Sequence, residues 1–248
     1  MMTTSCTKDC IVYGASVIGK SHILNHTSNQ DFFRIKRTKY GIAMTVCDGV
    51  GSERYSQFGS KAASKAVIKT FKLYHHGKIS KDSIGEKIEF YYKKYLWPKH
   101  RSAAGTTCLF ALVYADNEII IGQAGDGVIL IKADNKFAVF QNKSDDFMNE
   151  VSALTCKYPY KHWKIKNLKF DFHQNRQLKI LLSTDGISED IIPEKREVFL
   201  EYFISLTKSN SESSLPNELK NWNVPGSIDD KTVITFAWRN NNECLSEG

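Results

Sequence analysis

The sequence lacks a long apolar run. Its longest runs, such as LFALVYA (109–115), have the length of a strand, whereas a membrane-spanning helix needs about 20 apolar residues. The first residues, MMTTSCTKDCIVYG, have neither a basic segment nor an extended apolar core, so they do not resemble a secretory signal peptide. We therefore expect neither a membrane protein nor a secreted one.

Cysteines are few and irregularly spaced. The six stand at positions 6, 10, 47, 108, 156 and 244, and no two of them form a CxxC pair. This spacing fits neither a disulfide framework nor a structural zinc finger. It predicts reduced, mostly buried thiols in a cytoplasmic protein.

Internal repeats and low-complexity segments are also missing. The chain has 248 residues, of which 42% are hydrophobic and 25% charged, and these values are ordinary for a globular protein with a sizeable core. The one polar stretch rich in structure breakers, SNSESSLPNE (209–218), reads as a surface loop before a short element. We therefore expect a single domain over residues 1–248.

The charge is unbalanced, with a net value of +7. A basic surface attracts nucleic acids, phosphoproteins or acidic membranes, and the sign alone does not choose among them. The most basic stretch, KYPYKHWKIKNLK (157–169), has interleaved aromatic residues that could stack on single-stranded bases. A strand with a solvated basic face is the more ordinary interpretation, so we do not expect a nucleic acid partner.

The first part of the chain combines strands and helices. Short apolar, partly β-branched runs at 9–14 and 40–47 predict two strands. From about residue 56 to 75, apolar residues recur at spacings of four, which predicts a helix. A second helix is expected to start near Ser80, which can serve as its N-cap, and to end before Pro98.

The pattern then changes to strands separated by short turns. Strand-like runs follow one another at 107–114, 118–124, 128–132 and 136–141, with Asp-Asn or Gly-Asp-Gly between them. Links this short join only antiparallel neighbours. Two further strands are predicted at 178–184 and 232–238, with helical spacing between them near 199–206. Because strict alternation of strand and helix is absent, we expect an α+β fold of antiparallel sheets flanked by helices.

Several predicted strands end at an aspartate beside glycine. Asp48, Asp126 and Asp185 each follow an apolar strand, the pair Asp229-Asp230 precedes the last strand, and Asp31 closes the segment 28–31. Taken singly, each is an ordinary turn residue. Together, carboxylates at sheet ends can converge on one edge, where bound cations would relieve their repulsion. Oxygen ligands without a His/Cys set favour magnesium, manganese or calcium over zinc.

Six short sequence blocks, taken in their order along the chain, resemble those of the metal-dependent protein phosphatases of the type 2C family. The stretch 47–63 is similar to the family's Asp-Gly block and following helix, and the later similar blocks are AGTT (104–107), GQAGDG (122–127), LLSTDGISED (181–190) and DDKTVITF (229–236). SHILNHTSNQD (21–31) resembles the opening block of a bacterial branch. The resemblance implies an αββα sandwich, that is, two stacked antiparallel β-sheets flanked by helices.

The resemblance also implies two or three magnesium or manganese ions at one end of the sandwich. By position, Asp48 would bridge two metals, and the Gly49 carbonyl would help to hold the second. Asp185 and Asp229 would bind the first metal.

Three further carboxylates match the family. Asp126 and Glu189 occupy positions that contact a third, weaker ion in bacterial members, and Asp31 would order water beside the metals. A two-metal site of about 3.5–4 Å lowers the pKa of a bridging water and neutralises a phosphate ester under attack. The chain has no convincing Ser/His/Asp or Cys/Arg nucleophile motif, which suits water as the attacking group. The expected activity is hydrolysis of phosphoserine and phosphothreonine.

The chain departs from the family at the phosphate-binding positions. Where many members carry an arginine before the first-block aspartate, this sequence has His26, and Val50 replaces a histidine common in eukaryotic members. Gln30 stands where many members have glutamate. We therefore take His26 and His22 as candidates for holding the phosphate or protonating the leaving group, although ordinary exposed histidines fit equally well.

Two other functions compete with a phosphatase. GASVIGKS (14–21) matches the P-loop pattern G-x-x-x-x-G-K-[ST], which would indicate a nucleotide triphosphatase or kinase. A P-loop runs into a helix, however, and the following residues have little helical periodicity. The departures at His26 and Val50 motivate a metal-binding but inactive recognition module. For a phosphatase, the expected partners are a phosphoprotein substrate and a serine/threonine kinase.

Overall fold

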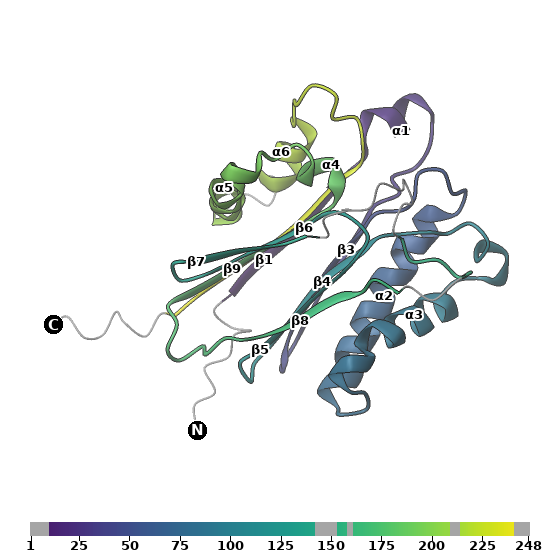
Figure 1. Cartoon of the computed structure of the whole chain (residues 1–248). Coiled ribbons are helices and arrows are strands. Elements are labelled where there is room, and N and C mark those ends of the chain that lie inside the picture. Colours follow the sequence, from purple (N-terminus) through teal and green to yellow (C-terminus); the bar gives the residue numbers. More distant parts are fainter. Residues whose placement is uncertain (1–9, 142–152, 158–160, 209–213, 241–248) are drawn as a thin grey trace.

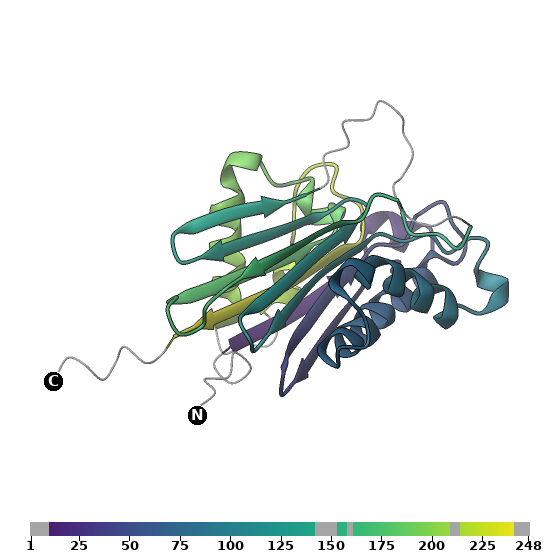
Figure 2. The same cartoon turned by 60° about the horizontal axis from the view of Figure 1, so that its bottom comes forward.

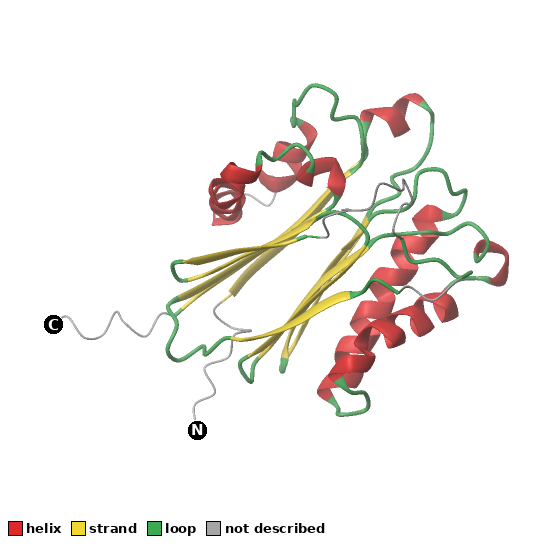
Figure 3. Cartoon of the chain, in the orientation of Figure 1, coloured by secondary structure: helices red, strands yellow, loops and turns green. Residues whose placement is uncertain are grey.

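The computed structural model describes residues 10–141, 153–157, 161–208 and 214–240. Cys6, Cys244 and the first part of the polar stretch 209–218 lie outside the described residues. Two five-stranded antiparallel sheets stack face to face (Figures 1 and 3). The first sheet has the order β1 (Cys10–Val17), β10 (Lys231–Arg239), β9 (Gln177–Ser183), β6 (Val128–Ala133) and β7 (Lys136–Phe140). The second has the order β2 (Phe32–Thr38), β3 (Gly41–Cys47), β4 (Cys108–Tyr114), β5 (Glu118–Ala124) and β8 (Lys164–Lys169).

Helices cover the outer face of each sheet, as Figures 1 and 2 show. The second sheet is covered by α2 (Ser56–His75) and α3 (Ile84–Tyr95), and the first by α5 (Arg196–Lys208) and α6 (Ser214–Lys220). The predicted α+β sandwich is therefore confirmed. The remaining elements are α1 (Lys20–Leu24), α4 (Asp185–Ser188) and the 3₁₀ turns η1 (Lys81–Ser83), η2 (Pro98–His100) and η3 (Pro193–Lys195). None of the helices in the described part of the chain has the length and apolar character to cross a bilayer.

Three apolar layers explain why the central strands are buried throughout. In β3, Ile42, Met44 and Val46 face the core between the sheets, whereas Ala43 and Cys47 face α2 and α3. Alternating side chains thus meet apolar surroundings on both faces of the sheet. The run GIAMTVC is accordingly apolar except for the buried Thr45, and it stops at Asp48, where the strand leaves the core.

The Gly-Asp-Gly turn differs from its prediction. The runs now seen as β5 and β6 were expected to pair, but β5 pairs with β4 and β8 whereas β6 pairs with β7 and β9. Residues 125–127 therefore carry the chain from one sheet to the other. Gly125 and Gly127 have φ values of 88° and 95°, a region open mainly to glycine, and this allows the abrupt change of direction.

Several smaller elements also differ from the predictions. The second helix begins at Ile84 rather than near Ser80, because η1 precedes it, and α6 begins within the stretch expected to be a loop. β2 and α4 have no predicted counterpart, since β2 carries three basic residues and α4 has only four residues. The basic stretch forms edge strand β8, with exposed Lys164, Lys166 and Lys169, as expected for a solvated basic face.

The P-loop hypothesis fails on topology. β1 is an edge strand that pairs antiparallel with β10, whereas a P-loop follows a strand of a parallel sheet. The helix after it, α1, has five residues, none of them buried. The backbone N–H of Gly19 donates to Asp230 Oδ1 at 2.7 Å and is not available to a phosphate.

Candidate metal centre

Aspartates from both sheets converge at one end of the sandwich. Asp48 follows β3, Asp126 lies between β5 and β6, and Asp185 follows β9 as the first residue of α4. One carboxylate oxygen from each of the three lies within 4.8 Å of the others. The sheets stack so that the ends of β3 and β9 meet, and residues distant in sequence thereby become neighbours.

The backbone of Asp48 is fixed by the Gly-Thr-Thr block before β4. Its N–H donates to Thr107 Oγ1 at 2.9 Å. Its carbonyl accepts from Thr106 Oγ1 at 2.8 Å and from the Thr107 N–H at 2.7 Å. Three hydrogen bonds thus hold the backbone of Asp48 just beyond the end of β3, and its side chain is left to face the cluster.

Gly49 occupies a position without room for a side chain. A Cβ there would lie 2.8 Å from the backbone carbon of Ser56 and 2.9 Å from the Gln30 carbonyl oxygen. The Gly49 N–H donates to that same carbonyl at 3.2 Å. The close approach of these segments keeps the Asp48-Gly49 turn tight, and only glycine fits it.

Asp31 is buried beside Asp48 and is also positioned by a threonine. Thr184 Oγ1 donates to Asp31 Oδ2 at 2.8 Å, and the Asp31 N–H donates to Asn29 Oδ1 at 2.8 Å. The other carboxylate oxygen, Oδ1, is buried and has no hydrogen-bond donor within the described residues. A buried acceptor without a donor favours a site that receives a further ligand.

The cluster is electrostatically unfavourable without cations. Burial, followed by the charges of Asp31, Asp185 and Asp229, raises the pKa of Asp48 well above its ordinary value. Burial and the neighbouring aspartates raise the pKa of Asp185 to about 8. Burial also raises the pKa of Asp31 to about 6, and the polar neighbours Asp48, Thr232 and Thr184 only partly oppose the shift. Divalent ions would replace the protons that these carboxyl groups retain, and an all-oxygen donor set fits magnesium or manganese.

Asp126 and Glu189 lie at the edge of the cluster. Both side chains are exposed, yet partial desolvation raises the pKa of each carboxyl, and the charge of Asp229 adds to the effect. These two residues therefore border the same acidic site from its solvent side. The third, weaker ion that the resemblance implies for these two residues stays a prediction.

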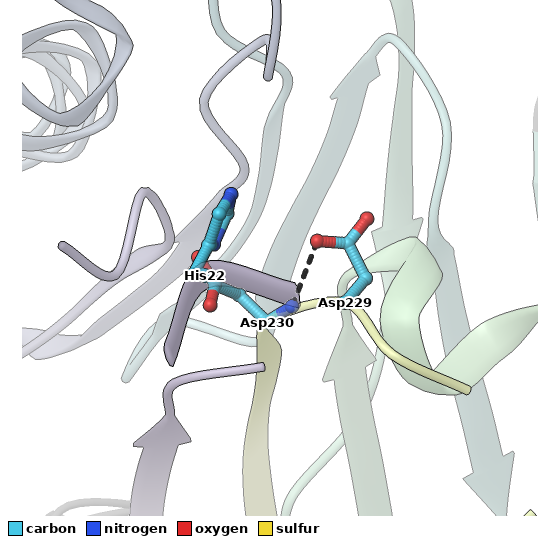
Figure 4. Close-up of side chains that lie close together, drawn as sticks. All are labelled: His22, Asp229 and Asp230. Carbon is cyan, nitrogen blue, oxygen red and sulfur yellow. Dashed lines mark hydrogen bonds and ion pairs between the residues drawn. The ribbon is translucent and has the colours of Figure 1, made fainter. Parts of the chain in front are cut away.

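The Asp229-Asp230 pair divides into an exposed residue and a buried one. Asp229 is exposed, and its Oδ1 accepts the Asp230 N–H at 2.8 Å (Figure 4). Asp230 is buried, and its two oxygens accept the N–H groups of Gly19 at 2.7 Å and Gln30 at 2.6 Å. Asp230 thus joins the start of β10 to the segments around α1. Sequence reasoning missed this role, for which the doubled aspartate was the only signal.

The two candidate histidines occupy different environments. His22 Nδ1 lies 2.8 Å from Asp230 Oδ2, although its alignment is not that of a hydrogen bond, so the contact is an ion pair only when the imidazole is protonated. The potential metal-ligand atoms of His22, Asp229 and Asp230 lie within 4.8 Å of one another, and Figure 4 shows the three side chains. His26 is exposed, has a left-handed φ of 52°, and belongs to neither group of potential metal ligands found within the described residues.

Comparisons with known proteins show the family and the fold. A family model described as protein phosphatase 2C matches residues 18–222. Among solved structures, a bacterial serine phosphatase is similar with a TM-score of 0.65 and 15% identity, over 93% of this chain and 98% of that chain. RsbX in complex with magnesium gives a TM-score of 0.59 and 16% identity, over 93% and 96%. Serine-threonine phosphatase 2C from Toxoplasma gondii gives 0.63 and 12%, over 92% and 94%. At these identities the structures show a shared fold, and no curated protein matches the chain.

Proposed function

The chain belongs to the protein phosphatase 2C family of metal-dependent serine/threonine phosphatases, and on that premise we propose that it hydrolyses phosphoserine or phosphothreonine at a binuclear magnesium or manganese site. The observation that carries the proposal is the convergence of Asp48, Asp126 and Asp185 within 4.8 Å. Carboxylates gathered this closely and partly desolvated are strongly unfavourable unless divalent ions neutralise them.

Each predicted ligand has a defined part in the proposed site. Asp48 would bridge the two ions, with the Gly49 carbonyl helping to hold one, and Asp185 and Asp229 would bind the other. The threonine hydroxyls that fix the Asp48 backbone support this assignment, because a bridging ligand requires a rigid backbone. Asp126 and Glu189, at the exposed edge, would contact a third and weaker ion.

The chain's own residues would orient water and phosphate. When bound, two such ions lower the pKa of a water between them and neutralise the phosphate. Asp31 would accept a hydrogen bond from that water through its unpartnered Oδ1, while Thr184 keeps Oδ2 in place. When its imidazole is protonated, His22 would donate a hydrogen bond to the phosphate through Nε2, while Nδ1 faces the Asp230 carboxylate. His26 remains a candidate from the sequence.

The proposal extends to the organisation of the protein and its partners. We propose one phosphatase domain over residues 1–248, a phosphoprotein substrate and an opposing serine/threonine kinase. The cysteines 47 and 108 are unpaired thiols buried in the core, which supports a reducing cytoplasmic location.

The direct test is hydrolysis of p-nitrophenyl phosphate and a phosphoserine peptide with and without manganese. We expect manganese-dependent release of phosphate that falls at least about a hundredfold in Asp48→Asn, because that change removes the bridging carboxylate. Asp116→Asn, which alters an exposed aspartate in the turn between β4 and β5, should leave the rate unchanged. Manganese binding without hydrolysis would instead indicate a recognition module.

A further inference from the structure

A mostly apolar groove lies beside the α5–α6 layer, outside the metal cluster. It has a volume of about 300 Å³ and is formed by Asp190–Ile192, the first turns of α5 and Trp222. Its base is rigid, because Trp222 Nε1 donates to Asp190 Oδ2 at 2.7 Å and the rings of Phe199 and Trp222 meet edge to face. At the rim, Ile192 and Val198 are 62% and 65% exposed. Apolar side chains left in water around a preformed hollow favour a binding surface.

Both walls of the groove are connected along the chain to candidate ligands of the cluster. Asp190 follows Glu189, and the segment after Trp222 leads to Asp229 at the start of β10. The Trp222–Asp190 hydrogen bond ties these two walls together. Because Asp190 directly follows Glu189, the groove begins beside the cluster, where a side chain next to a bound phosphorylated residue could reach it.

The charges of the groove indicate the chemistry of its occupant. The Asp190 carboxylate is partly satisfied by the Trp222 N–H, whereas Lys195 is exposed and forms no ion pair with a described residue. Of the two charged residues that line the groove, the Asp190 anion is thus already held by Trp222, whereas the Lys195 cation is open to a partner. A partner that complements this surface carries an apolar side chain with an acidic group close to it.

We propose that this groove binds an apolar side chain of the phosphoprotein substrate, next to the phosphorylated residue, while an acidic substrate residue pairs with Lys195. The inference rests on the proposed function and names a substrate class for the same site. The groove would select among phosphoproteins, since the metal cluster contacts only the phosphate that all of them share.

The test uses phosphoserine nonapeptides in which one leucine is moved through each position flanking the phosphoserine, in an alanine and serine background. For each peptide, kcat/KM is divided by the value for p-nitrophenyl phosphate, which is too small to span the groove. Leucine at one particular position relative to the phosphoserine should raise this ratio about tenfold or more over the leucine-free peptide, since burying a leucine contributes that much to affinity. Placing aspartate beside that leucine should raise the ratio further, and Lys195→Glu should reverse this second gain.

Matched variants separate the groove from the rest of the surface. Val198→Glu and Ile192→Glu should erase the leucine preference, and neither threatens folding because both residues are exposed. Val139→Glu, the same change at an exposed valine of β7 that does not line the groove, should retain it. A preference that is absent from the parent, or that survives both groove variants, would overturn the proposal.

A binding readout distinguishes this inference from the proposed function. Fluorescence anisotropy of the labelled peptides should show the same leucine preference with parent protein and with Asp48→Asn. If p-nitrophenyl phosphate and the peptides are not hydrolysed while the binding preference persists, the proposed function fails and the groove stands. If the substrates are hydrolysed but neither readout shows a leucine preference, the groove inference fails and the proposed function stands.

Discussion

At the scale of single residues, the candidate metal centre is built from carboxylate residues that neighbouring hydroxyl and N–H groups hold in place. Thr106 and Thr107 fix Asp48, and Thr184 fixes Asp31. The convergence of Asp48, Asp126 and Asp185 could be predicted, because each stands where an apolar strand stops. Asp230 could not, since its partners Gly19 and Gln30 lie 211 and 200 residues away in sequence.

The hydroxyl of Thr107 should matter for catalysis. Thr107→Val keeps the shape of this buried residue but removes the acceptor for the Asp48 N–H, so Asp48 loses one of the hydrogen bonds that hold its backbone. We expect kcat to fall roughly tenfold and the free energy of unfolding by about 1–2 kcal/mol. The measurement is manganese-dependent hydrolysis together with urea unfolding.

Thr70 offers the matched control. It is also fully buried, but its Oγ1 has no hydrogen-bond partner within the described residues. Thr70→Val should therefore leave kcat unchanged and leave stability unchanged or raised. An equal loss of kcat in both variants would show that the hydrogen bond to Asp48 is not the cause.

The two histidines can be separated by alanine substitution. His22 lies against Asp230 and close to Asp229, whereas His26 is exposed, so His22→Ala should raise KM for a phosphopeptide several-fold more than His26→Ala. The comparison uses saturating manganese, to keep metal loading equal. A larger effect from His26→Ala would restore the assignment made from sequence position.

At the scale of elements, the passage from β5 to β6 determines where Asp126 lies. Short turns usually join neighbours in one sheet, and this general rule gave the wrong pairing here. The physical reason is that Gly125 and Gly127 both adopt positive φ and carry the chain across to the other sheet. β2 escaped prediction because its Arg34, Lys36 and Arg37 obscure the apolar pattern of an edge strand.

The crossing should not tolerate a side chain at Gly127. A Cβ there would lie 2.6 Å from the Ser183 carbonyl oxygen, and φ is 95°. Gly127→Ala should lower the free energy of unfolding by about 3 kcal/mol, through steric overlap added to backbone strain. Gly226→Ala is the control, because φ is 87° but no atom lies within 4 Å of the added Cβ, and it should cost only about 1–2 kcal/mol. Chemical denaturation of both variants measures the difference, and equal losses would rule out the overlap.

At the scale of the whole molecule, a basic chain concentrates carboxylates at one end, and this couples folding to pH and metal. The pKa values of Asp48 and Asp185 in the folded state exceed the ordinary value of 3.8, that of Asp185 reaching about 8. At pH values between the ordinary and the raised pKa, the folded, metal-free state holds protons that the unfolded chain has released. Its stability therefore falls as pH rises through the window from about 4 to 8.

Manganese should reverse this trend, because at the proposed site it would bind the ionised carboxylates of the folded state. We expect manganese to raise Tm more at about pH 7.5 than at about pH 5.5, since fewer protons then compete with the ion. In Asp48→Asn, the metal-free Tm at the higher pH should exceed that of the parent, because one repulsive charge is gone. Equal manganese shifts at both pH values would argue against binding at these carboxylates.

The claim at the centre of this account is that Asp48 bridges two metal ions at the junction of the sheets. Anomalous diffraction from a manganese-soaked crystal tests it most directly, because it locates each ion independently of activity. The account predicts two manganese peaks about 3.5–4 Å apart, both bonded to Asp48, with Asp185 and Asp229 on one of them. A single ion held by His22, Asp229 and Asp230, with Asp48 unliganded, would contradict it.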